Sequence, residues 1–223
     1  CKVARYSGVR IRTCAPVASI NCRNGTCLGV STSNGQSYNS KMVISGLDTA
    51  NTFIKLVGTP EISPTFQRQL INIKYRGSTA RIHYSLKKCP KITGIELNQQ
   101  DSIFTINPSI EYIERAYDDA KYGRISTNPY IEFNIPSLTA PDFAPSGKHV
   151  LSATVQYIPY HLRNANWNEE LKKLVIQKNT HILEKYIPEF SNIINDSYIM
   201  TPLEMEASQG LTEGNLNHGE MTL

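Results

Sequence analysis

The chain has 223 residues, of which 40% are hydrophobic and 19% charged, with a formal net charge of +4. This composition is ordinary for a globular protein of one or two domains. Lys and Arg are scattered rather than clustered, and no apolar run approaches the ~18 residues of a membrane span, so we expect neither nucleic-acid binding nor a membrane-spanning segment.

Five cysteines and the first residue bear on the cellular compartment and on completeness. Cys1 stands where a start methionine is usual and no signal-peptide pattern follows, so we expect a piece of a longer protein from the cytoplasm, with the mitochondrion as the alternative. Cys22 and Cys27 flank a turn, where either two reduced thiols or a cross-strand disulfide fits. No Cys/His pair completes a zinc site with them, so we expect no metal.

The first 58 residues read as a short helix end, a β-meander and a second helix. Gly8 follows the first helix as its stop signal, and Asn24-Gly25 marks a two-residue hairpin because both turn positions need a positive φ. Asn34-Gly35 marks a second turn. The apolar triplet 42–44 predicts a strand buried on both faces, and Asp48 can cap a helix that runs to about Val57.

The next segments mix helices and strands without strict βαβ alternation. Ser63-Pro64 opens a helix with Phe66 and Leu70 on one face. Residues 78–86 alternate as a half-buried strand, and residues 90–106 read as irregular. A helix is expected from Asn107 to Lys121, ended by Gly123. Its apolar face is expected to comprise Ile110, Ile113, Ala116 (or Tyr117) and Ala120.

Two further strands are expected at 131–135 and 149–158, and Tyr157 shares the apolar face of the second with Leu151. The Pro-rich loop 137–147 is longer than usual and is a candidate lid. These strands, together with 78–86, predict the wall of an apolar pocket unless a helix covers that face completely. Tyr130, Tyr157 and Tyr160 are the aromatic candidates for such a pocket, although aromatic side chains on a sheet are more often plain core.

A long helix is predicted from about Glu169 to Tyr186, capped by Asn166 or Asn168. Residues 197–206 are a further strand candidate, with Pro202 favouring an edge position. His218 lies between glycines, in a turn of the kind that lets backbone approach a ligand. The buried stripe of the long helix is expected to comprise Leu171, Leu174, Val175, Ile182 and Tyr186.

This element order predicts an α+β fold. The motifs Gly-x-Gly-x-x-Gly, Gly-x-x-x-x-Gly-Lys-Ser/Thr and Gly-x-Ser-x-Gly are all absent. No side chain stands out as a catalytic acid, base or nucleophile.

Several segments together resemble a known family. The order and spacing of these segments are similar to phytoene-desaturase-like FAD-dependent oxidoreductases of the amine oxidase superfamily, and particularly to pyridine nucleotide-disulphide oxidoreductase domain-containing proteins and their bacterial relatives. The segments are IRTCAPVASI (11–20), VISGLD (43–48), AKYGRIS (120–126), APSGKHV (144–150), QYIP (156–159), TPLE (201–204) and HGEM (218–221).

The resemblance implies a fold, a cofactor and site residues. Residues 1–58 are expected to be the β-meander part of a two-dinucleotide FAD-binding domain, and residues 59–223 a mixed-sheet substrate domain, incomplete at its C-terminus. The backbone of Val17 is expected to meet the adenine of FAD, and Ser45 and Gly46 to pass under the cofactor. Tyr130, Tyr157 and His218 are the candidates for the substrate pocket.

The implied reaction is hydride transfer between an apolar or amphiphilic small molecule and flavin. The flavin carries that chemistry, while the protein positions the substrate. The alternative is a non-catalytic binding or interaction module without a cofactor site of its own. The substrate, the electron acceptor and the oligomeric state stay open.

Overall fold

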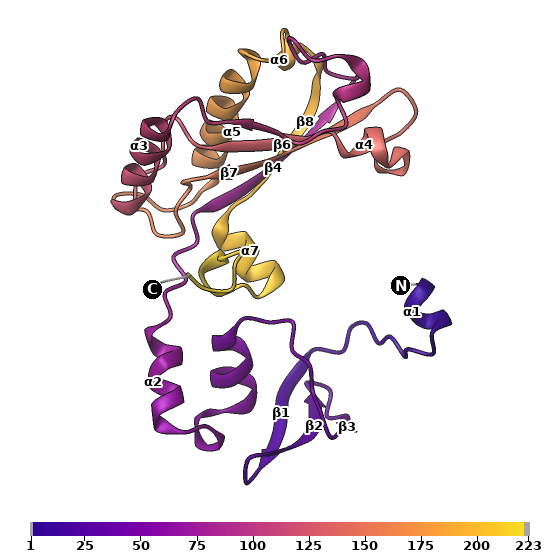
Figure 1. Ribbon diagram of the computed structural model, residues 1–223, viewed down its shortest axis with the longest axis vertical. Helices are drawn as coiled ribbons and strands as arrows, with labels where there is room; N and C mark the ends of the chain where they lie inside the picture. Colours follow the sequence, from indigo (N-terminus) through magenta and orange to yellow (C-terminus); the bar gives the residue numbers. More distant parts are fainter. Residues whose placement is uncertain (1, 221–223) are drawn as a thin grey trace. The chain divides into compact units, whose positions relative to one another are not determined.

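The structure, a computed structural model, describes residues 2–220. The chain divides into two compact units between Lys74 and Tyr75 (Figure 1). The sequence predicts a domain boundary after residue 58, and the helical segments between residues 59 and 72 lie in the N-terminal unit. Helices and antiparallel strands occur in both units, and the fold is of the α+β class.

The N-terminal unit contains the predicted β-meander. Helix α1 (Lys2–Tyr6) precedes three antiparallel strands, β1 (Val17–Arg23), β2 (Thr26–Thr32) and β3 (Ser37–Asn39). Asn24 and Gly25 have φ values of 51° and 73°, as a type I′ turn requires. Cys22 pairs with Cys27 across the hairpin, which confirms the predicted register, and both are free thiols.

The expected strand at 42–44 is wrong. The segment has no regular structure, and Met42 is 72% and Ile44 90% exposed. An apolar strand is stable where neighbouring strands bond its backbone and other layers cover both faces. No described strand of the N-terminal unit pairs with this segment.

Three helical segments complete the N-terminal unit, and one of them is the short 3-10 helix Thr59–Glu61. The Asp48 carboxylate accepts a hydrogen bond from the backbone N–H of Asn51 at 2.8 Å, as a cap does. The helix that follows, Ala50–Val57, is a π-helix rather than the expected α-helix. Helix α2 (Pro64–Asn72) begins with Pro64 in its first turn, as predicted, and the hydroxyl of Ser63 caps it.

The C-terminal unit is built on a five-stranded antiparallel sheet with the order β5-β6-β7-β4-β8. Strand β4 pairs with β7 along its whole length, and β7 pairs with β6, so the three strands predicted at 78–86, 131–135 and 149–158 are neighbours. Strand β5 lies in a segment that was expected to be irregular. The bounds are β4 (Thr79–Leu86), β5 (Phe104–Ile106), β6 (Ile131–Asn134), β7 (His149–Gln156) and β8 (Ile194–Met200).

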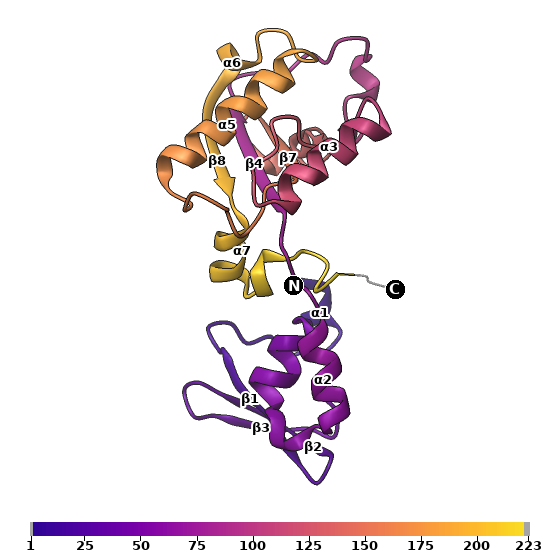
Figure 2. The ribbon, with the colours of Figure 1, turned by 90° about the vertical axis from the view of Figure 1, so that its left-hand side faces the viewer.

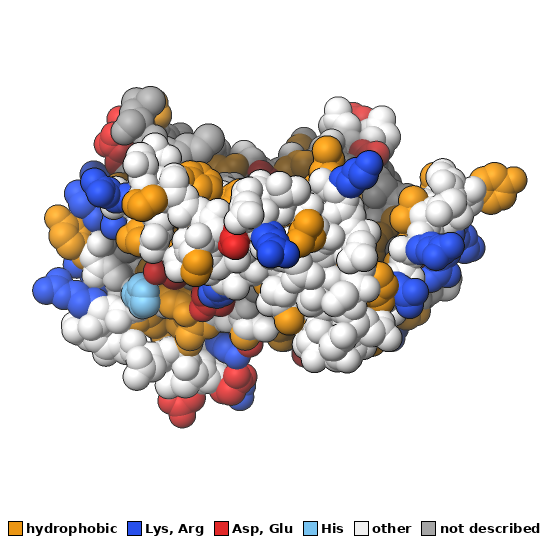
Figure 3. Space-filling view, turned by 90° about the horizontal axis from the view of Figure 1, so that it is seen from below, with side chains coloured by type: hydrophobic (Ala, Val, Ile, Leu, Met, Phe, Trp, Pro, Cys, Tyr) orange, Lys and Arg blue, Asp and Glu red, His pale blue; other side chains and the backbone are white. Residues whose placement is uncertain are grey.

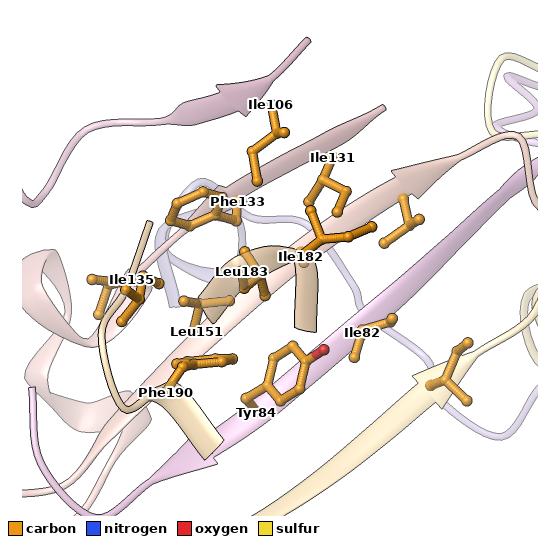
Figure 4. Close-up of a cluster of buried hydrophobic side chains, with 14 of the residues drawn as sticks. Ile82, Tyr84, Ile106, Ile131, Phe133, Ile135, Leu151, Ile182, Leu183 and Phe190 are labelled. Carbon is orange, nitrogen blue, oxygen red and sulfur yellow. The ribbon is translucent and has the colours of Figure 1, made fainter. Parts of the chain in front are cut away.

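Helix α5 (Glu169–Glu184) covers one face of this sheet (Figure 2). Its N-cap is Asn168, one of the two predicted caps. The side chains of Ile82, Leu151 and Leu183 belong to the core between sheet and helix (Figure 4). The Tyr84 ring packs edge-on against Phe190 of the short helix α6 (Phe190–Ile193), with the ring centroids 5.1 Å apart.

The buried stripe of α5 differs from the predicted one. It consists of Val175, Asn179, Ile182 and Leu183, whose spacing of four, seven and eight residues fits one helix face. Leu174 and Tyr186 are exposed instead, so the prediction was wrong for these two. Helix α3 (Ile110–Lys121) likewise begins three residues later than predicted, after Ser109, and exposes Ile110 at its first turn.

The predicted strand 197–206 is half correct. Strand β8 lies at the edge of the sheet but ends at Met200. Thr201 then forms a capping box with Glu204, and Pro202 opens helix α7 (Pro202–Gln209). Proline without an N–H group suits the first turn of a helix as well as a sheet edge, and the capping residues decide between the two.

None of the described helices is long and apolar enough to cross a membrane. Figure 3 shows Lys and Arg side chains at several places on the face that it draws, with hydrophobic and acidic side chains between some of them.

The burial of α5 predicts that replacing two of its leucines lowers the free energy of unfolding by unequal amounts. Leu183→Ala removes a fully buried side chain and is expected to lower the free energy of unfolding by about 2–5 kcal/mol. Leu174→Ala, at a position that is 44% exposed, is expected to cost less than about 1 kcal/mol. Urea unfolding of both variants measures the difference, and equal costs would contradict the observed rotation of the helix.

Candidate functional site

Tyr157 occupies a position that alternation alone does not predict. Strand β7 ends at Gln156, and Tyr157 has a left-handed backbone with φ of 73°. The turn takes Tyr157 out of the strand alternation, so its predicted place beside Leu151 on the core face is wrong. Ile158 is fully buried.

Backbone hydrogen bonds hold the chain in this turn. The N–H of Ile158 donates to the carbonyl of Ser78 at 2.8 Å, and the N–H of Tyr160 donates to the carbonyl of Gly77 at 2.7 Å. The carbonyl of Tyr157 accepts from Ser126 at 3.3 Å. The first two bonds fasten the segment after β7 to the segment before β4, and the third fastens it to the segment between α3 and β6.

Four segments of the C-terminal unit surround a cavity of about 710 Å³ at this end of the sheet. They are residues 76–78, the end of α3 with 117–123, residues 157–163 and the turn 215–220. Four tyrosines supply most of the aromatic lining, and we call this space the tyrosine cavity. They are Tyr117, Tyr122, Tyr157 and Tyr160. The volume lies in the range of about 300–1,000 Å³ that small-molecule sites occupy.

Two glycines let the backbones around the tyrosine cavity approach closely. The Gly123 carbonyl accepts a hydrogen bond from the N–H of Arg163 at 2.9 Å, and a Cβ at Gly123 would lie 2.9 Å from that nitrogen. A Cβ at Gly77 would lie 2.0 Å from the carbonyl oxygen of Glu213. Any larger residue would push these segments apart.

The turn 215–220 is organised by one buried side chain. The Asn215 amide donates to the carbonyl of Tyr75, and its oxygen accepts from the N–H groups of Asn217 (2.8 Å) and Gly219 (3.2 Å). Asn217 and Gly219 line the tyrosine cavity. His218, the predicted pocket residue between them, is exposed and not part of that lining.

Charged groups also belong to the surroundings of the tyrosine cavity. Arg76 forms an ion pair with Glu220. The Tyr160 hydroxyl donates to the Glu206 carboxylate, and this hydrogen bond is the main cause that raises the pKa of Tyr160 to about 12. Lys121 and Arg163 also lie in the lining. Because the pKa of Tyr160 is raised to about 12, its hydroxyl is protonated at neutral pH and acts as a hydrogen-bond donor to Glu206.

The aromatic part of the lining centres on Tyr157. Its ring meets that of Tyr117 edge-on, with the centroids 6.2 Å apart. Burial raises the pKa of the Tyr157 hydroxyl. Tyr130 lies outside the lining, and its carbonyl accepts a backbone bond from Gln156 at 2.9 Å.

The sheet itself does not form an apolar pocket wall. Its apolar face is filled by α5, and the opposite face carries a smaller polar groove of about 200 Å³. Among the groove residues, His83 Nδ1 lies 2.9 Å from Ser152 Oγ, and burial lowers the pKa of His83. The expectation of an apolar wall on this sheet is therefore wrong.

The loop 137–147 is not a lid on the tyrosine cavity. Ser137 Oγ lies 3.0 Å from His149 Nδ1 and accepts from the N–H of Val150, which fixes the loop at the start of β7. The tyrosine cavity lies beyond the other end of β7. Helices α4 (Pro136–Thr139) and α3 accordingly stand at opposite ends of the sheet (Figure 1).

The three residues that the resemblance assigns to FAD lie in the N-terminal unit. Val17 opens β1 and is 41% exposed, and nothing lies within 4 Å of a Cβ placed at Gly46. The Ser45 hydroxyl lies 2.7 Å from that of Thr52 and is already engaged. The adenine contact expected of the Val17 backbone, and the passage of Ser45 and Gly46 under the cofactor, stay predictions. These residues provide no cradle for a pyrophosphate.

No group of three His, Cys, Asp or Glu suited to a metal ion occurs within the described range 2–220.

Comparison with known proteins points to one group of relatives. The chain is 29% identical over 230 residues to the pyridine nucleotide-disulfide oxidoreductase domain-containing protein 2 of Rattus norvegicus, and 28% identical over 238 residues to that of Mus musculus. Each alignment covers 99% of the chain but 40% of the relative. The chain thus spans less than half the length of these relatives. No family model matches it.

Solved structures share the fold. A Pyrococcus furiosus protein and an oxidoreductase from Methanosarcina mazei each superpose with a TM-score of 0.56 at 17% identity. They cover 89% and 90% of the chain, and 40% of each of those proteins is matched.

The close approach of the backbones at Gly123 predicts that adding one methyl group there lowers the stability of the protein strongly. Gly123→Ala meets both the left-handed backbone, with φ of 71°, and the Arg163 backbone, and it is expected to cost about 2–4 kcal/mol of stability. Gly147→Ala has φ of 73° with open space around it, so about 1 kcal/mol is expected. Denaturant unfolding of both variants tests this, and matching losses would show that the contact at Gly123 is unimportant.

Proposed function

We propose that this chain is part of an FAD-dependent oxidoreductase of the desaturase or dehydrogenase type. The observation that carries the proposal is the similarity, over 99% of the chain, to two proteins that are named for an oxidoreductase domain. The shared fold with an oxidoreductase from Methanosarcina mazei agrees with it. In this proposal the N-terminal unit belongs to the flavin-binding domain and the C-terminal unit binds the substrate.

A bound flavin would accept or donate the hydride. The residues of this chain would position the other reactant. Tyr117 and Tyr157 offer aromatic faces to a substrate with an apolar body. The pair of Tyr160 and Glu206 fixes one wall, because Glu206 also accepts a hydrogen bond from the N–H of Glu213 at 2.9 Å. The substrate class that fits this lining is an apolar or amphiphilic small molecule.

The 223-residue chain alone is expected to bind FAD weakly. Val17, Ser45 and Gly46 offer main-chain contacts, whereas a glycine loop at a helix N-terminus normally holds the pyrophosphate, and this chain has no such motif. Titration of the purified chain with FAD, followed by flavin fluorescence, measures the affinity. A yellow purified protein, or micromolar binding, would refute this expectation.

The test of the proposed function uses the gene's complete reading frame. The purified product is expected to carry FAD, seen as flavin absorption that is released on denaturation. Tyr157→Ala is expected to keep the flavin and to lower turnover at least tenfold, because substrate positioning is lost. Tyr198→Ala is the matched control, because Tyr198 is an exposed tyrosine of β8 outside the tyrosine cavity.

Two outcomes would contradict this account. A complete product without flavin would favour the alternative of a binding module. Unchanged turnover of Tyr157→Ala would remove the tyrosine cavity from the reaction.

A further inference from the structure

Two cations of the tyrosine cavity have no carboxylate partner. Three cationic side chains, Arg76, Lys121 and Arg163, line the cavity, together with the carboxylate of Glu220, which is engaged in the ion pair with Arg76. Two further carboxylates lie behind the lining, where Glu206 accepts from the Tyr160 hydroxyl and Glu213 lies 3.9 Å from His161. Lys121 and Arg163 are left.

Neither of these two cations is neutralised elsewhere in the described chain. Within residues 2–220, no carboxylate lies within 4 Å of the Lys121 or Arg163 side chain. Lys121 Nζ lies over the Tyr122 ring, 5.8 Å from its centroid. Arg124, by contrast, is paired with Asp119 and lies outside the lining.

The position of Arg163 is fixed by its backbone rather than by its side chain. Its N–H donates to the Gly123 carbonyl at 2.9 Å, at the point where Gly123 admits no Cβ. This contact brings Arg163 to the C-terminal end of α3, where Lys121 lies. The guanidinium keeps its five donors for a ligand, and a planar guanidinium matches carboxylate and phosphate oxygens.

We propose that the tyrosine cavity binds a ligand with one anionic group on an apolar body, with the anion held by Arg163 and Lys121 and the body against Tyr117 and Tyr157. The name "substrate" for this ligand rests on the proposed function, whereas the binding does not. Aromatic rings and two cations without a carboxylate partner in one lining suit a molecule that has both features. A neutral hydrocarbon would gain nothing from the two cations.

The test is a binding titration that needs no flavin. Trp167 is the single tryptophan of the chain, and its indole N–H donates to the carbonyl of Pro159, a residue of the lining, at 3.3 Å. Its fluorescence therefore reports on the cavity. The probes are decanoate, decyl phosphate and decanol, which share one chain length and differ in the head group.

Decanoate or decyl phosphate is expected to bind the unaltered 223-residue chain at least tenfold more tightly than decanol, because charge-assisted hydrogen bonds form with the anions alone. The stronger of the two anions distinguishes a carboxylate site from a phosphate site. Arg163→Ala is expected to weaken anion binding about tenfold and to leave decanol binding unchanged. Arg163→Lys is expected to restore part of the loss.

Arg115→Ala is the matched control, because Arg115 is an exposed arginine of α3 outside the lining, and it is expected to change the anion affinity less than twofold. The exposed side chain of Arg163 makes loss of folding an unexpected result, and thermal unfolding checks it. Equal affinities for decanol and both anions would overturn the proposal. Unchanged anion binding by the double variant Arg163→Ala/Lys121→Ala would overturn it as well.

This test separates two failures. If the 223-residue chain prefers the anions but the product of the complete reading frame carries no flavin, the proposed function is refuted and the anion site is not. If the complete product carries flavin but the chain shows no preference for the anions, the anion site is refuted and the proposed function is not.

Discussion

The left-handed backbone of Tyr157 is the constraint on which the site depends. A non-glycine residue with φ of 73° costs of order 1–3 kcal/mol, and it persists only where surrounding contacts impose it. Here the hydrogen bonds of Ile158 to Ser78 and of Tyr160 to Gly77 impose it. The turn ends the alternation of β7 and puts Tyr157 in the lining of the tyrosine cavity. The sheet therefore keeps a closed apolar core and carries its larger cavity at its end.

The same logic explains the glycines around the tyrosine cavity. Gly77 and Gly123 have no Cβ, and at these two positions backbone approaches backbone within hydrogen-bond reach. Neither glycine contributes a functional group. Both set the distance between segments that do, so their substitution is expected to disturb the site through geometry rather than chemistry.

Much of the fold could be predicted from local pattern. The alternation of residues 78–86 and 149–158 predicted two strands, of which the second ends at Gln156. Asn168 and Pro64 predicted helix starts, because a cap and a proline in the first turn are local signals. The prediction of a strand at 42–44 was wrong because a strand depends on non-local partners. Apolar residues alone do not supply the neighbouring strands that would bond its backbone. The predicted buried stripe of α5 was wrong at Leu174, because rotating a helix by one residue leaves almost the same pattern of apolar residues on its buried face.

The site was harder to predict than the fold. Tyr157 and Tyr160 were recognised as aromatic candidates, but Arg76, Tyr117 and Arg163 come from separate segments that only the tertiary structure brings together. Gly123 was identified as a helix stop, and nothing in the sequence shows that its missing Cβ also admits Arg163. The pattern of one sheet face indicated an apolar wall, because alternation shows that a face is buried without showing what buries it.

The most direct measurement of the central claim is an NMR titration of the chain with tyrosine rings labelled with ¹³C and assigned by single Tyr→Phe variants. Addition of decanoate is expected to shift the ring signals of Tyr117 and Tyr157, which line the tyrosine cavity. The signals of Tyr84 in the core and of Tyr38 in the N-terminal unit should stay in place. Shifts confined to Tyr38, or equal shifts of all four rings, would contradict the assignment of the ligand site to the end of the sheet.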